Sequence, residues 1–127
     1  MATSRPKPGT SKNPERKKAR SIDAAAHHKA RILKALAHPV RVAIFELLAD
    51  GEQTVGEIVA CLGIKEANAS RHLALLRSAA LVATRKEGLS VYYSIKMPCL
   101  LPMLSCIVDA ICTLADEQGE IAATLRG

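Results

Sequence analysis

Three cysteines near the C-terminus, Cys99, Cys106 and Cys112, are the side chains in this sequence best suited to bind a soft metal ion. On one continuous helix the first two share a face, but their spacing of seven residues places them roughly 10 Å apart along the axis. Zn–S bonds of about 2.3 Å require neighbouring sulfurs only about 4 Å apart, so this pair cannot chelate alone. A site for zinc, cadmium or trivalent arsenic therefore needs a bend at Pro102, the C-terminal tail or a second copy of the chain.

The alternative is that the cysteines are small apolar side chains that bind nothing. This interpretation suits Cys61 best, because it falls within a predicted core-facing helix. For the three C-terminal cysteines both interpretations stay open, and Cys112 is the best single candidate for a sensing role.

A second group of side chains, between positions 65 and 96, suits hydrogen bonding to DNA. Asn68 and Arg71 have the donor geometry that reads adenine and guanine edges, whereas Lys65 and Ser70 suit phosphate oxygens. This segment carries six basic and two acidic residues, a net charge of +4. The candidate DNA-contacting residues are Lys65, Glu66, Asn68, Ser70, Arg71, Arg85 and Lys86.

Helical periodicity predicts four helices ahead of and through this segment, at about 21–37, 39–50, 54–62 and 65–78. The first ends before Pro39, because the residue preceding a proline resists helical geometry. Thr54 and Glu57 form a capping box at the start of the third helix, and Gly63 supplies its left-handed end. A short turn therefore separates the third helix from the fourth.

Two strand-like runs, Leu81–Lys86 and Ser90–Ile95, follow around a Glu87-Gly88 turn, and Arg85 and Lys86 lie beside that turn. From Pro98 the pattern becomes helical again, and the helix starts or bends at Pro102. The fold class is therefore mainly α with a small β-hairpin wing, a winged helix-turn-helix. In such a fold the second helix of the motif enters the major groove. His72, next to the inner face of that helix, is predicted to be packed and hydrogen-bonded.

Net charge divides the chain into an N-terminal arm and a neutral remainder. Residues 1–20 carry seven basic side chains and one acidic one, whereas residues 21–127 hold eleven of each. Such an arm lacks the apolar surface to fold, and either tracks DNA phosphates or acts as a solubilising tail. The predicted organisation is a disordered arm at 1–20, a DNA-binding domain at 21–115 and a helix end or tail at 116–127.

A cytoplasmic protein with reduced cysteines is expected, because no signal peptide is visible. The apolar run 97–108 contains two prolines and is too short to span a bilayer, so no membrane partner is expected. Enzymatic activity has no support, since no Cys-x-x-Cys pair, Gly-rich phosphate loop or nucleophile elbow occurs.

The segments AHPVRVAIFELLADGEQTVGEI, ASRHLALLRSAALVATRKEG and VYYSI resemble the ArsR/SmtB family of bacterial transcriptional repressors over about residues 30–112. This resemblance implies a homodimer, formed through the first and last helices, that binds an operator in double-stranded DNA. The apolar stripes at 32–36 and 104–111 suit that dimer. It also implies release from DNA by a metal, an arsenical or a sulfur oxidant.

The inducer sites known in the family are largely absent here. Arsenic and cadmium sensors carry cysteines where this chain has Thr54 and Gly56, and another subgroup carries them at Leu75 and Ala79. The zinc-sensor positions are Met97, Cys99, Ala110 and Thr113. Cys112 matches one cysteine of the sulfur sensors, but Glu46 replaces the other.

Three departures from the family pattern affect DNA contact. Lys65 replaces the usual capping Ser or Thr, which costs about 1 kcal/mol unless phosphate binding compensates. Ala80 replaces a glycine, and Leu89 occupies a wing position that is often arginine.

The leading hypothesis is a homodimeric repressor released by a metal, arsenical or thiol-reactive inducer. One alternative is a constitutive regulator with structural cysteines, and another is a winged-helix adaptor that binds protein rather than DNA.

Overall fold

The computed structural model describes residues 21–116, and the chain divides at Arg31 into two units that are treated separately. The predictions for the arm at 1–20 and for the tail beyond Asp116 lie outside the described residues. The first unit contributes the start of α1 (Ala24–Leu36), and every side chain from 21 to 31 is exposed. Asp23 caps α1, because its Oδ1 accepts a hydrogen bond from the backbone N–H of Ala26 at 2.8 Å.

The second unit begins its helical core with α2 (Pro39–Leu47), extended by the 3-10 turn η3 (Leu48–Asp50). His38 is the N-cap of α2, since its Nδ1 accepts from the Val40 N–H at 3.1 Å, and Pro39 occupies the first helical position. The predicted break before Pro39 is therefore confirmed. Proline suits this position because the first helical N–H has no partner within the helix.

The helix-turn-helix consists of α3 (Val55–Leu62) and α4 (Glu66–Ser78). The predicted capping box is present: Thr54 Oγ1 accepts from the Glu57 N–H at 3.2 Å, and Glu57 Oε1 accepts from the Thr54 N–H at 2.8 Å. Gly63 ends α3 with a φ of 65°, a left-handed conformation that glycine adopts without strain. Lys65 is the N-cap of α4 and makes no side-chain capping bond.

The wing is an antiparallel hairpin of β2 (Val82–Glu87) and β3 (Ser90–Ile95), closed by the Glu87–Ser90 pair. A short strand that the sequence did not suggest, β1 (Gln53–Thr54), pairs with β3 and gives a three-stranded sheet of order β1-β3-β2. Between α4 and β2, Ala80 takes the family's glycine position with a φ of 63°. The expected class, mainly α with a small β-hairpin wing, is confirmed.

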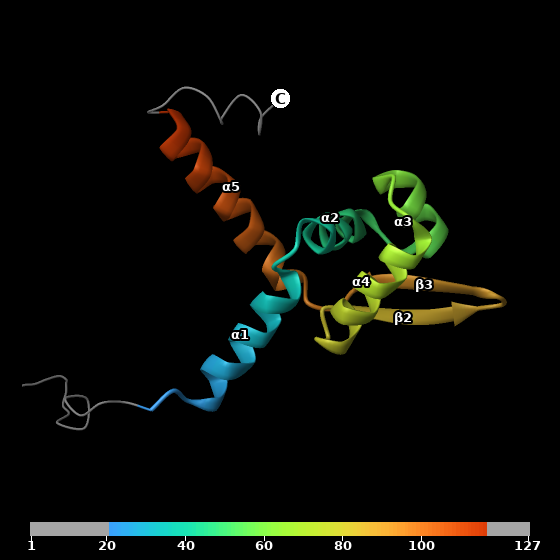
Figure 1. Cartoon of the computed structure of the whole chain (residues 1–127), viewed down its shortest axis with the longest axis horizontal. Helices are drawn as coiled ribbons and strands as arrows, with labels where there is room; N and C mark the ends of the chain where they lie inside the picture. Colours follow the sequence, from blue (N-terminus) through green and yellow to red (C-terminus); the bar gives the residue numbers. More distant parts are fainter. Residues whose placement is uncertain (1–20, 117–127) are drawn as a thin grey trace, which may run out of the picture. The chain divides into compact units, whose positions relative to one another are not determined.

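The core lies where α2, α3 and α4 pack together and where α4 meets β2 (Figure 1). The largest fully buried side chains are Ile44, Phe45, Ile58, Leu73, Leu76, Leu81 and Val82. Cys61 is a correction, because it lies on the exposed side of α3 and not in this core. The α3 side chains that pack in the core, Val55, Ile58 and Leu62, span about 60° around the helix, and Cys61 lies about 60° outside that span.

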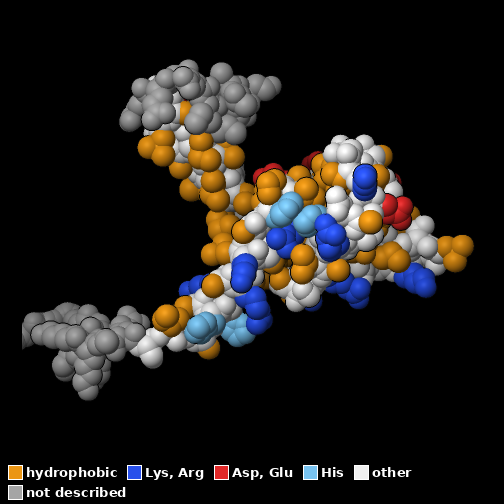
Figure 2. All heavy atoms as spheres, in the orientation of Figure 1, with side chains coloured by type: hydrophobic (Ala, Val, Ile, Leu, Met, Phe, Trp, Pro, Cys, Tyr) orange, Lys and Arg blue, Asp and Glu red, His pale blue; other side chains and the backbone are white. Residues whose placement is uncertain are grey.

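The chain continues through a 3-10 turn, η4 (Pro98–Leu100), into α5 (Leu101–Asp116). Pro102 stands in the first turn of α5, so the helix starts there and Pro102 removes no internal hydrogen bond. Leu104 belongs to the core, but four later apolar side chains are exposed: Ile107, Val108, Ile111 and Leu114. Figure 2 shows hydrophobic side chains running along this helix.

The expectation about membrane-spanning length also needs correction. The helical segment Pro98–Asp116 has 19 residues and, by length and composition alone, could cross a membrane. The sequence-based estimate ended at Val108 because Asp109 follows, whereas the helix runs on through this single charge. Length and composition fit equally well a helix whose apolar face is covered by another protein surface.

Candidate nucleic-acid interface

The α4 helix has one face for the core and one for solvent. Ala69, His72, Leu73 and Leu76 are buried, at the spacing that one side of a helix requires. All five candidates predicted near its N-terminus are exposed together: Lys65, Glu66, Asn68, Ser70 and Arg71. The packing of α4 against α2, α3 and β2 therefore directs these polar side chains outward.

Asn68 and Arg71 contact each other on this surface. Arg71 Nη2 donates to Asn68 Oδ1 at 2.8 Å, across one helical turn. This bond occupies the amide oxygen of Asn68 and leaves its NH₂ group and the remaining guanidinium N–H groups of Arg71 as donors. The pair is thus oriented as one unit toward hydrogen-bond acceptors, of which guanine and adenine edges in the major groove are rich.

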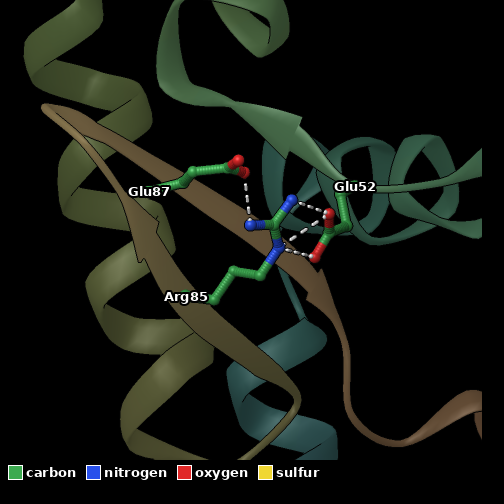
Figure 3. A network of polar contacts seen from close by, with 3 residues as sticks. All are labelled: Glu52, Arg85 and Glu87. Atoms are coloured by element: carbon green, nitrogen blue, oxygen red, sulfur yellow. Dashed lines mark hydrogen bonds and ion pairs between the residues drawn. The ribbon is translucent and has the colours of Figure 1, made fainter.

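Arg85 is held by protein side chains and does not extend freely from the wing. Its Nε and Nη2 bind Glu52 at 2.8 to 3.0 Å, and its Nη1 binds Glu87 at 2.7 Å (Figure 3). Its guanidinium carbon also lies 4.6 Å from the centroid of the Tyr92 ring. The hydrogen bonds from Arg85 lower the pKa of the Glu52 carboxyl, and the two carboxylates raise the pKa of Arg85.

The Arg85 network changes what the wing can offer to DNA. Arg85 and Lys86 are balanced by Glu52 and Glu87, so the wing carries no local excess of positive charge. Lys86 is exposed and makes no hydrogen bond or ion pair with any residue between 21 and 116. It is therefore the free cation of the hairpin, next to a turn where Leu89 is completely exposed.

Sequence reasoning missed Glu52 because it lies 33 residues from Arg85. Periodicity relates neighbours along the chain, whereas this contact depends on β1 pairing with β3 and so placing Glu52 beside the wing. A glutamate next to a short strand carries no local signal of such a partner.

His72 is buried, with 7% of its surface exposed, but its predicted hydrogen bond is not found: within the described chain its Nδ1 has no partner. Burial is the main cause of a lowered pKa for His72, and the neighbouring His38, Arg41 and Arg71 lower it further. The imidazole is therefore neutral near pH 7.

The three C-terminal cysteines do not assemble a site within one described chain. Cys99 lies in η4 and is exposed, Cys106 is exposed on α5, and Cys112 is buried outside the core cluster. Six residues of helix separate Cys106 from Cys112, which places them roughly 120° apart and about 9 Å along the axis. Among residues 21–116, no group of three or more histidine, cysteine or acidic side chains could hold a metal ion.

An outward polar face on the second helix of a helix-turn-helix, followed by a hairpin wing, defines the class of winged helix-turn-helix proteins. A family model described as a helix-turn-helix domain matches residues 36–85. The HTH-type transcriptional regulator Rv0081 of Mycobacterium tuberculosis is 33% identical over 99 residues, covering 77% of this chain and 87% of that protein. Its crystal structure covers 76% of this chain and 98% of its own, at 32% identity and a TM-score of 0.66.

A second solved structure carries the family name. It is the homodimeric winged helix-turn-helix DNA-binding domain Mb0332 of Mycobacterium bovis, described as a possible ArsR-family transcriptional regulator. It is 35% identical, covers 73% of this chain and 87% of its own, and gives a TM-score of 0.64. The Biofilm growth-associated repressor of Agrobacterium fabrum is 44% identical over 62 residues, or 49% of this chain and 53% of that one. The chain belongs to the ArsR/SmtB family of winged helix-turn-helix transcriptional regulators.

Proposed function

We propose that this chain is a homodimeric repressor that binds an operator through α4 of each protomer. The observation that carries this proposal is the exposed set on α4, with Asn68 and Arg71 joined at 2.8 Å above a fully buried opposite face. Two such helices in a dimer would enter successive major grooves about 34 Å apart. Repression is the mode of regulation named for several of the relatives.

The proposed dimer uses the apolar face of α5. Ile107, Ile111 and Leu114 lie within about 60° of one another around the helix and are 36% to 64% exposed. Removing apolar side chains of this size from water is favourable in free energy, so their exposure favours a surface that covers them. A second copy of the chain, packing α5 against α5, would cover this face, and Mb0332 is described as homodimeric.

Salt-dependent binding to duplex DNA tests the first part of the proposal. A dimer that neutralises several phosphates should lose affinity linearly in log K against log salt, with a slope of about −0.9 for each phosphate. The measurement is fluorescence anisotropy on a duplex selected from a random library and on an unrelated duplex of the same length. A protein-binding adaptor would bind neither duplex at any salt concentration. A reporter gene placed behind the selected duplex then tests repression.

Release by a soft metal, an arsenical or a thiol-reactive inducer is the second part of the proposal. Cys99 and Cys106 are exposed and so can react with such agents, whereas a metal site would need ligands from beyond residues 21–116 of the same protomer or from a partner protomer. Replacing Cys99, Cys106 and Cys112 together by serine should abolish release by cadmium, arsenite or a sulfane oxidant. The Cys61→Ser variant is the matched control, since Cys61 is also exposed but lies on α3. Unchanged release in the triple variant would support the constitutive regulator instead.

A further inference from the structure

The N-terminus of α2 and the inner edge of α4 form a junction of two arginines and two histidines, made by His38, Arg41, Arg71 and His72. The ring centroids of His38 and His72 are 4.4 Å apart, with their planes tilted by 42°. Arg41 and Arg71 lie near enough to His72 for their charges to affect its titration. Figure 2 shows histidine and basic side chains gathered on the face that includes this region. We call these four residues the α2–α4 junction.

Two nitrogen atoms in the α2–α4 junction are buried without a hydrogen-bond partner in the described chain: Arg41 Nε and His72 Nδ1. The Nε–H group of arginine is always a donor, so Arg41 lacks an acceptor. Buried polar groups in folded proteins are almost always paired, which makes two orphans on neighbouring helices unusual. No ion pair to a carboxylate balances Arg41 or Arg71 anywhere between residues 21 and 116.

The backbone N–H groups at the start of α2 are not the main donors available to a ligand at this junction. His38 already accepts the Val40 N–H at 3.1 Å, and Pro39 has no N–H. Whatever binds here must therefore be held mainly by side-chain donors, with the positive end of the α2 dipole adding to the attraction. Donors without acceptors, and positive charge without counter-charge, together describe a site for an anionic oxygen.

We propose that the α2–α4 junction binds a backbone phosphate of duplex DNA. This inference rests on the proposed DNA-binding function and extends its footprint from α4 onto α2. Arg71 belongs both to the exposed face of α4 and to the junction, and Arg41 and Arg71 both lie near His72, so we expect a duplex engaged by α4 to reach Arg41 as well. A phosphate oxygen accepts charge-assisted hydrogen bonds from guanidinium, and arginine favours phosphate for this geometry. A bound water would pair the orphan nitrogens but would leave the positive charge of Arg41 uncompensated.

The Arg41→Ala variant tests the site against the Arg77→Ala control, which removes an exposed basic residue from the last turn of α4. Loss of one phosphate contact should weaken binding to the selected and the unrelated duplex by the same factor, roughly fivefold to tenfold, and make the salt slope shallower by about one. Arg77→Ala should change neither. Unchanged affinity and slope in Arg41→Ala, or a loss confined to the selected duplex, would overturn the proposal.

Thermal unfolding of each variant separates a contact from a folding defect. Should Arg41→Ala not fold, Arg41→Gln keeps an amide that can hydrogen-bond within the junction while removing the charge, and the same loss of slope is expected. His38→Asn keeps an acceptor for the Val40 N–H and should weaken both duplexes less than Arg41→Gln does.

Free phosphate is distinguished by melting the wild type in inorganic phosphate and in chloride at equal ionic strength. Phosphate stabilisation that Arg41→Ala abolishes, together with unchanged DNA binding, would assign the site to a free anion and overturn the DNA proposal. If the wild type itself binds no duplex, the proposed DNA-binding function fails first, and the variants then do not differ from it.

Discussion

The two longest helices of the second unit, α4 and α5, differ in how much of their apolar surface one chain can cover. In α4 the residues Ala69, His72, Leu73 and Leu76 are buried, and the exposed face is largely polar. In α5 only Leu104, Cys112 and Ala115 are buried, while the apolar residues Ile107, Val108, Ile111 and Leu114 face solvent. A helix completed within one chain can present polar groups to a ligand, whereas α5 has an apolar face left for another surface.

The largest expected effect concerns the buried side of α4. Leu73→Ala removes a completely buried side chain and should lower the free energy of unfolding by about 2–5 kcal/mol, because it leaves a cavity in the core. Urea unfolding followed by circular dichroism measures this. Leu75→Ala is the matched control, since Leu75 is 44% exposed on the same helix and its loss should cost far less. Equal costs would mean that α4 is not packed as described.

A charge introduced on α5 tests whether its exposed apolar face forms the dimer interface. Ile111→Asp places a carboxylate in the exposed apolar face and should weaken self-association by roughly 2 kcal/mol or more, about 30-fold, because burying an unpaired charge is unfavourable. Sedimentation equilibrium measures the dimer fraction. Thr113→Asp introduces the same charge at an exposed polar position and should leave the dimer intact. If Ile111→Asp stayed dimeric, this face of α5 would not be the interface.

A substitution on the polar face of α4 should change the affinity for DNA and leave the free energy of unfolding unchanged. Arg71→Ala removes a candidate guanine contact and the partner of Asn68, so affinity for the selected duplex should fall by about 1–3 kcal/mol. The unrelated duplex should lose less, and competition between the two duplexes measures the change in specificity. Binding as tight as that of the wild type would remove Arg71 from the reading face.

The smallest effect is expected at the wing. The pKa of Glu52 is lowered by its hydrogen bonds with Arg85, so the interaction contributes stability above the ordinary carboxyl pKa of 4.5 and loses it as the pH falls through the lowered value. Arg85→Ala should return the Glu52 pKa toward 4.5, as carboxyl chemical shifts in an NMR titration would show. Because both side chains are exposed, only a slight change in thermal stability should accompany it. An unshifted Glu52 in the variant would mean that the pair is not formed in solution.

Local rules predicted the helices and their ends well. The Thr54–Glu57 capping box, Gly63 and the start of α2 at Pro39 each depend on residues within a few positions of one another. Features that depend on distant contacts were missed or misjudged. The Glu52–Arg85 pair requires the β1–β3 register, and the length of α5 beyond Asp109 depends on propagation through a single charge.

The candidate site follows the same division. Exposure of the set from Lys65 to Arg71 could be inferred from helical spacing, because the apolar residues between them define the buried side. The neutralisation of Arg85 could not, and neither could the orphaned nitrogens of Arg41 and His72, since both need the packing of separate elements. Charge counts along the sequence therefore overstated the positive character of the wing and gave no sign of the α2–α4 junction.

Ala80 lies between the reading helix and the wing with a φ of 63°, where alanine has a much narrower range of comfortable backbone angles than glycine. Because Ala80 has few alternative backbone angles at this position, it limits movement of the wing relative to the C-terminal end of α4. A tilt of α4 would then move the wing tip at Leu89 together with the helix. The helix and the hairpin would therefore bind the duplex and release it together.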